Sequence, residues 1–225
     1  MSSCTVKAMA SRKKVENLAH GDVKRLVLDA AIAIIADEGP DALSMREVAR
    51  RANISHQAPY HHYIDRAGIF AAIAEEGFRI FSEQFRSTLD STTQPLNDCL
   101  RAYVKFAFGH QGHFKVMFRS DICGVTSHEA TRRAADDAFL VLLDFAARVD
   151  PREKTPSESI ALPVLLWSQA HGLATLLIDG PLVNKLPPEV SVDQLIDTVG
   201  ELIANAMSTT ASGRLRQPAH KSRPK

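Results

Sequence analysis

The sequence is short of cysteine and of long apolar runs, and both shortages limit what the protein can be. Its three cysteines (Cys4, Cys99 and Cys123) are odd in number and far apart, which argues against a disulfide framework and a CxxC metal site and fits a reducing compartment. No apolar run approaches the roughly 20 residues that span a bilayer. The polar, basic first 25 residues contain no apolar core of a signal peptide. We therefore expect a cytoplasmic protein with no membrane partner.

Charge is distributed unevenly along the chain, although its formal net charge is only +1. Residues 1–25 hold six basic and two acidic residues, and residues 210–225 hold five basic residues and no acidic one. Residues 67–209 hold 18 acidic and 12 basic residues. A basic end attached to an acidic body favours a polyanionic partner at that end. The C-terminal basic stretch, with its glycine and prolines, is more typical of a disordered tail.

Helical periodicity runs through nearly the whole chain, and no segment shows convincing strand alternation. Thr155 and Glu158 are spaced as a capping box with Pro156 between them, which is a strong helix start. Pro163 predicts a kink in the helix that follows, and Ser191 caps the last helix. The sequence therefore predicts an all-α fold, with helices over about 23–38, 44–52, 55–63, 66–89, 95–111, 112–120, 127–149, 156–178 and 191–208.

Two short helices joined by a tight turn are predicted between residues 44 and 63. Ser44 and Glu47 are spaced as a capping box, in which each satisfies an amide of the other. Asn53 stands where a left-handed residue is needed between the helices, and Ser55 can cap the second one. A support helix followed by two short helices around a tight turn is the helix-turn-helix pattern, whose second short helix enters the major groove of DNA.

The second short helix carries small and polar side chains that suit base recognition: His56, Gln57, Ala58 and His61. Glutamine can pair with adenine, and an alanine methyl can contact a thymine methyl. Lys24 and Arg25 lie in the first turn of the support helix, where the helix dipole disfavours cations, and nearby phosphates would offset that conflict. A metal site formed by the histidines and Asp65 is the less favoured alternative, because their spacing lacks the i, i+4 glutamate-assisted pattern of a zinc helix.

The run from Ser44 to Tyr63 (SMREVARRANISHQAPYHHY) and the following residues 64–69 resemble the DNA-binding segment of TetR-type transcriptional regulators. The segment from Trp167 to Gly172 resembles the Trp-x-x-x-His-Gly feature of a subgroup with a WHG-type C-terminal domain. The resemblance covers about residues 22–209. It implies a ligand-responsive repressor that binds a pseudo-palindromic operator in double-stranded DNA as a homodimer.

Two other classes of protein stay open as alternatives. One is a helical hydrolase or thiol enzyme, against which we find no glycine-rich phosphate loop, nucleophile elbow, HExxH motif or paired carboxylates around a histidine. The other is an interaction module whose N-terminus does not bind DNA. The sequence predicts no catalytic residue, no metal and no cofactor.

The resemblance implies DNA contacts for ten residues. Ser44 would cap a helix and meet a phosphate, the Tyr60 hydroxyl would touch the DNA backbone, and Arg66 would contact another phosphate. Pro59 departs from a simple helix because it disfavours an α conformation at Ala58, which leaves the start of the recognition helix open. The ten residues are Ser44, Arg46, Ser55, His56, Gln57, Ala58, Tyr60, His61, His62 and Arg66.

The helical body is expected to enclose an apolar pocket for a small organic effector. Its candidate lining residues are Phe78, Phe81, Phe106, Met117, Phe118, Trp167 and His171. For the last two, a packed Trp–His pair is the favoured alternative to a ligand contact.

We expect a flexible basic arm over 1–21, a helix-turn-helix domain over 22–66, a ligand-binding and dimerisation domain over 67–209 and a disordered basic tail over 210–225. The helices over about 156–178 and 191–208 are apolar around more of their circumference than a surface helix needs, with Leu173 among their apolar residues. Two such helices from each of two chains would form a four-helix bundle. The alternative is that these faces pack only within their own chain.

Overall fold

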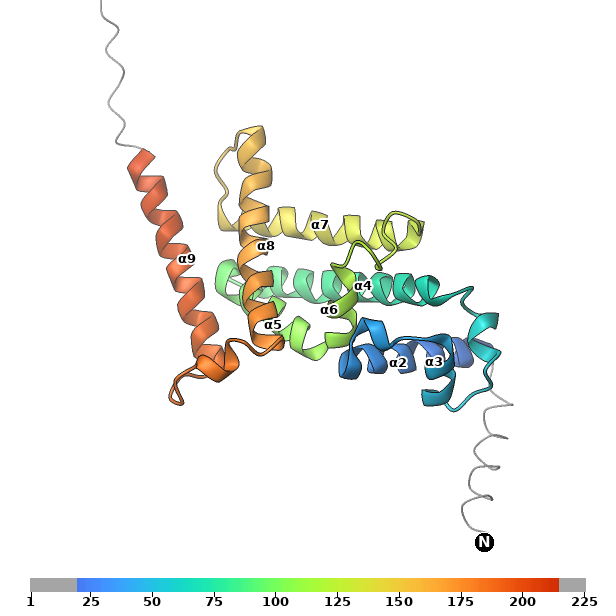
Figure 1. Ribbon diagram of the computed structural model, residues 1–225. Coiled ribbons are helices and arrows are strands. Elements are labelled where there is room, and N and C mark those ends of the chain that lie inside the picture. Colours follow the sequence, from blue (N-terminus) through green and yellow to red (C-terminus); the bar gives the residue numbers. More distant parts are fainter. Residues whose placement is uncertain (1–19, 215–225) are drawn as a thin grey trace, which may run out of the picture. The chain divides into compact units, whose positions relative to one another are not determined.

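The computed structural model describes residues 20–214, and within that range every regular element is a helix (Figure 1). The prediction of an all-α fold is confirmed. The α-helices are α2 (His20–Glu38), α3 (Met45–Arg51), α4 (Arg66–Ser91), α5 (Pro95–Gly109), α6 (Gln111–Met117), α7 (Glu129–Val149), α8 (Pro156–Ile178) and α9 (Val192–Arg214). Three short 3-10 helices accompany them: η1 (Pro40–Ala42), η2 (Ala58–His61) and η3 (Val183–Lys185).

The predictions for the two ends of the chain can be checked only in part. Residues 1–19 of the predicted basic arm and residues 215–225 of the predicted tail lie outside the described residues. The last helix was expected to end near residue 208, but α9 continues to Arg214. Residues 210–214, which we had assigned to a disordered tail, are therefore helical.

The predicted starts of the two C-terminal helices are confirmed by their capping hydrogen bonds. The Glu158 amide donates to Thr155 Oγ1 at 3.3 Å, and the Thr155 amide donates to the Glu158 carboxylate at 3.1 Å. At α9, the Gln194 amide donates to Ser191 Oγ at 3.2 Å, and the Ser191 amide donates to Gln194 Oε1 at 2.9 Å. Each pair satisfies amides that a helix start otherwise leaves unbonded.

The described chain forms two compact units, each made of two separate stretches of sequence. Residues 20–84 and 106–142 form the first unit, and residues 85–105 and 143–214 form the second. Helices α4, α5 and α7 contribute residues to both units. The division at residue 66 into a DNA-binding and a ligand-binding domain remains a prediction.

In the first unit, α6 packs closely against the support helix α2. A methyl group on Gly112 would lie 2.4 Å from the carbonyl oxygen of Ile32, so the absence of a side chain permits this approach. Lys115 Nζ donates to the carbonyl of Ala36 at 2.8 Å, which satisfies one of the carbonyls that the end of α2 leaves free. The helix-turn-helix segment therefore shares one close-packed unit with α4 and α6.

In the second unit, α8 contributes Leu166, Ala170, Leu173, Ala174 and Leu177 to the buried core. The rings of Phe85 and Phe145 meet edge to face, with centroids 5.6 Å apart. Arg101 ties α5 to α9, because its guanidinium pairs with Asp193 and Asp197. These contacts give the second unit a core of its own.

Helix α8 is also long and apolar enough to cross a membrane by length and composition, which the search for apolar runs did not predict. Its central polar residues Ser168, Gln169 and His171 break the apolar run without adding a formal charge, which explains the difference. Only 28% of its most apolar window is buried within the chain. Much of the apolar surface of α8 is therefore uncovered in the single chain.

Candidate nucleic-acid interface

Helix α3 starts at Ser44, as predicted, but the capping box is only half formed. Ser44 has extended backbone angles, and its Oγ accepts the Glu47 amide at 3.1 Å. The Glu47 carboxylate instead accepts from Arg50 Nε at 2.7 Å on the next turn. The charged partner Arg50 thus takes the carboxylate that the sequence pattern assigns to the Ser44 amide.

The turn after α3 has the geometry that the sequence predicts. Asn53 has a φ of 54°, in the left-handed region. The Asn53 amide donates to the Arg50 carbonyl at 3.2 Å, and the Ile54 amide donates to the Ala49 carbonyl at 3.0 Å. This pair of bonds is the Schellman arrangement that ends a helix and reverses the chain. The turn therefore directs residues 55–62, here called the reading segment, away from α3.

The reading segment is not the helix over 55–63 that the sequence predicts, since only Ala58–His61 is helical and it is a 3-10 turn. Pro59 supplies no amide hydrogen, so the bond that would continue an α-helix from residue 59 to Ser55 cannot form. Its side chains are nevertheless available to a partner. Five of them are exposed: Ser55, His56, Gln57, Tyr60 and His61, while Ala58 and His62 are partly covered.

Two of the three arginines of α3 are paired within the chain. Arg50 pairs with Glu47, and Arg51 pairs with Asp37 at 2.5 Å and Glu38 at 2.6 Å. These ion pairs reduce the positive charge of this surface. Arg46 is exposed, and among the described residues it has no ion-pair partner, which makes it the best placed arginine of α3 for a phosphate.

Of the two cations at the start of α2, Arg25 is already paired within the chain, contrary to our expectation, whereas Lys24 is exposed and its contact with a phosphate stays a prediction. Arg25 Nε donates to Asp29 at 2.8 Å, and Arg25 Nη1 lies 2.5 Å from Glu76. His113 Nε2 is 3.1 Å from the same Glu76 carboxylate. Burial raises the pKa of Glu76, but the hydrogen bonds from Arg25 and His113 outweigh burial and hold it below its usual value. Arg25 therefore links α2 to α4 inside the first unit.

Arg66 lies at the start of α4, where the sequence places a phosphate contact. Its Nη2 donates to the Pro40 carbonyl at 3.0 Å, and its guanidinium lies 5.0 Å from the centre of the Phe70 ring. The side chain is 41% exposed. These contacts orient the guanidinium while leaving part of it accessible, so the phosphate role of Arg66 remains a prediction.

The aromatic residues predicted to line an effector pocket belong to both compact units. Phe78, Phe81, Phe106 and Met117 are buried in the first unit, and Phe118 is partly buried there. The rings of Phe78 and Phe118 meet edge to face at 5.9 Å, and those of Phe81 and Phe106 at 5.3 Å. These residues form a packed aromatic cluster, and an apolar pocket among them remains a prediction.

Trp167 and His171 lie in the second unit, where they meet a residue that the sequence analysis did not select. Trp167 Nε1 donates to the Tyr103 hydroxyl at 3.2 Å, and that hydroxyl is 2.9 Å from His171 Nδ1. Burial lowers the pKa of His171 and raises that of Tyr103. The neutral imidazole is therefore favoured in this half-buried cluster. Only the position of Tyr103 on the apolar face of its helix could have signalled it.

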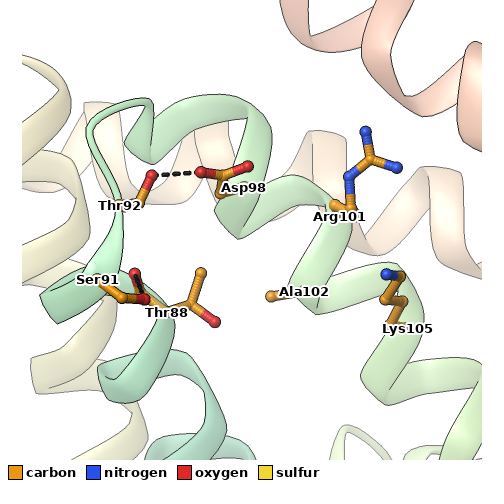
Figure 2. Close-up of a pocket in the computed structure, with 7 residues that line it drawn as sticks. All are labelled: Thr88, Ser91, Thr92, Asp98, Arg101, Ala102 and Lys105. Carbon is orange, nitrogen blue, oxygen red and sulfur yellow. Dashed lines mark hydrogen bonds between the residues drawn. The ribbon is translucent and has the colours of Figure 1, made fainter.

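A hollow of about 270 Å³ in the second unit is lined mostly by residues with polar side chains. Figure 2 shows hydroxyl side chains from the end of α4 on one side and the side chains of α5 on the other. Its lining residues are Thr88, Ser91, Thr92, Asp98, Arg101, Ala102 and Lys105. Arg101 is already paired with two aspartates of α9, which reduces the positive charge available in the hollow. Its lining shares no residue with the predicted effector pocket.

Two families match the chain in sequence. Residues 27–73 match the family "Bacterial regulatory proteins, tetR family", and residues 96–199 match "Tetracyclin repressor-like, C-terminal domain". The first match contains α3 and the reading segment, and the second contains the segment from Trp167 to Gly172. No curated protein matches the chain.

Solved structures share the fold at low sequence identity. A TetR-like transcriptional regulator from Rhodococcus sp. RHA1 is 20% identical, with a TM-score of 0.62 over 85% of this chain and 99% of that one. The fatty acid degradation regulator FadR from Bacillus halodurans is 12% identical, with a TM-score of 0.62 over 80% and 94%. AibR in complex with isovaleryl coenzyme A and operator DNA is 16% identical, with a TM-score of 0.56 over 82% and 97%.

Proposed function

Because the chain belongs to the TetR family of DNA-binding transcriptional regulators, which are not enzymes, we propose that it is a ligand-responsive repressor. It acts in the cytoplasm and binds a pseudo-palindromic operator as a homodimer. The observation that carries the proposal is the reading segment itself. A helix capped by Ser44 and a left-handed turn at Asn53 present Gln57, His56 and His61 to solvent on a close-packed unit.

The apolar surface of α8 supports the homodimer. A single helix-turn-helix buries little surface on DNA, so such proteins bind two half-sites with two chains. Leu165 is 47% exposed and Leu176 is 48% exposed, and Gly172, which lies on the same stripe of α8, has open space around its Cβ position. Leu202 of α9 is 64% exposed. Leu173, by contrast, is only 9% exposed, so an arginine there would disturb the core of the chain before it disturbed association.

The effector is proposed to be a small organic molecule. The AibR structure holds isovaleryl coenzyme A together with operator DNA, and this chain shares that fold. The candidate contacts are the aromatic cluster of the first unit and the Trp167–Tyr103–His171 cluster of the second. Effector binding would lower the affinity of the protein for DNA. The size of this decrease is set by how much more tightly the effector binds the free conformation of the protein than the DNA-bound conformation.

DNA binding by the full-length protein tests the proposal. Duplexes from the region upstream of its own gene are compared with random duplexes of equal length and composition, at several salt concentrations. We expect one upstream duplex to bind far more tightly, and Gln57→Ala to weaken that binding by about 1–3 kcal/mol while random DNA is nearly unaffected. Equal, purely salt-dependent binding of all duplexes by both proteins would contradict the proposal.

A further inference from the structure

Pro59 interrupts the hydrogen bonding of the reading segment at one defined place. In an α-helix that starts after Ser55, the amide of residue 59 would donate to the Ser55 carbonyl. Proline has no amide hydrogen, and here the Ala58 amide donates to that carbonyl at 3.1 Å. The Tyr60 amide then donates to the Gln57 carbonyl at 3.1 Å. Both bonds span three residues, so the segment winds as a 3-10 turn.

Pro59 also anchors the segment to the rest of the first unit. Its side chain is buried, whereas Gln57, Tyr60 and His61 around it are exposed. The turn η2 packs against α3 and α2. The residue that prevents the α-helix is therefore the one that fixes the turn to its support.

The winding of the turn decides which side chains share a face. A 3-10 helix has about 3.0 residues per turn and a rise of about 2.0 Å, against about 3.6 residues and 1.5 Å in an α-helix. Between Gln57 and His61 this difference amounts to roughly 80° of rotation and about 2 Å of rise. In an α-helix Gln57 and His61 would lie on one face, whereas in the 3-10 turn His61 aligns with Ala58 and Gln57 with Tyr60.

We propose that Pro59 is a specificity-determining positioning residue. By holding residues 58–61 as a 3-10 turn, it sets which base edges Gln57 and His61 reach together on one half-site. The inference rests on the proposed function, because it requires an operator. It adds that the preferred DNA sequence depends on a buried residue that itself touches no base.

Selection of bound duplexes from a random pool tests the proposal with the full-length wild type, Pro59→Ala and Pro59→Leu. Both variants restore the amide of residue 59 and differ in the volume they fill. We expect both to select the same new sequence, changed at adjacent positions of each half-site, and to bind the wild-type operator about tenfold or more weakly. Binding to random DNA should stay within about threefold of wild type, because it depends on phosphate contacts.

Val48→Ala is the matched control, since it removes buried side-chain volume from the neighbouring α3, where Val48 is fully buried, without adding an amide. It should lower thermal stability and still select the wild-type sequence. Hydrogen exchange gives a second measurement, in which the new amide of residue 59 should be protected. Wild-type selection by both Pro59 variants, or an equal change by Val48→Ala, would overturn the inference. A wild type that selects no sequence would overturn the proposed function and this inference with it.

Discussion

The reading segment and helix α8 present opposite kinds of surface to solvent. Around the reading segment, the apolar residues Pro59 and Tyr63 are buried and polar side chains are exposed. On α8, Leu166 and Leu173 are buried, but Leu165 and Leu176 are about half exposed. One surface suits a hydrated polyanion, and the other suits a second apolar surface. We therefore predict that replacing polar side chains at the reading segment will change DNA binding. Placing charged residues on α8 should instead change the association of two chains.

The largest effect is expected from placing charges on the apolar stripe of α8. Leu165→Arg with Leu176→Arg should convert the dimer into a 24.7 kDa monomer and lower operator affinity about 100-fold or more, because four buried charges would lack partners. Sedimentation equilibrium and operator binding measure the two effects. Leu140→Arg on α7, where Leu140 is 60% exposed, is the control and should leave the dimer intact. A double variant that stays dimeric would contradict the proposed interface.

A smaller effect is expected from the arginines of α3, which differ in whether their charge is already paired. Arg46→Ala should weaken binding to every DNA sequence about tenfold and reduce the slope of log K against log salt by about 1. Arg50→Ala should lower the logarithm of the DNA-binding constant by less than half as much as Arg46→Ala, because Glu47 already neutralises Arg50. Titrations at several salt concentrations separate the two. Equal salt slopes for both variants would show that the internal ion pair does not matter.

The smallest effect concerns the pH dependence of the stability of the protein. Burial lowers the pKa of His171, so below the unfolded value of about 6.5 the unfolded chain binds a proton that the folded chain resists. Stability should therefore fall as pH drops from 7.5 to 5.5. His171→Gln, which can still accept from the Tyr103 hydroxyl, should reduce that fall in Tm by a few degrees. His110, whose pKa burial also lowers, leaves part of the fall in place. If the Tm of His171→Gln falls with pH as steeply as that of the wild type, His171 is not a cause of the fall.

Much of the fold followed from local patterns because those patterns involve a few neighbouring residues. The box at Thr155 and Glu158 and the left-handed Asn53 depend on backbone angles and bonds within one turn. The half-formed box at Ser44 could not be predicted in the same way, because Arg50 competes for Glu47 on the next turn. The capping-box pattern does not say whether the Glu47 carboxylate will bind the Ser44 amide or the Arg50 side chain when both are close enough.

The candidate site was less predictable wherever distant residues decide its chemistry. The sequence placed Arg25 where phosphates would offset its charge, whereas Glu76 pairs with it from another helix. Arg51 is likewise paired with Asp37 and Glu38 of α2. Tyr103 was missed because its partners Trp167 and His171 are more than 60 residues away in the chain. Pro59 was noticed as a departure, but the 3-10 turn required the hydrogen bonds of the structure.

The contact between Gly112 and the Ile32 carbonyl makes one position of α6 almost immutable. A carbonyl oxygen at 2.4 Å from a hypothetical Cβ belongs to the backbone of α2, so no change of rotamer can make room for even a methyl group. A second substitution on α2 cannot compensate either, because every residue type carries the same carbonyl. Sequence change is thus restricted at a residue that lies outside the reading segment, and libraries built on this scaffold should keep Gly112 unchanged.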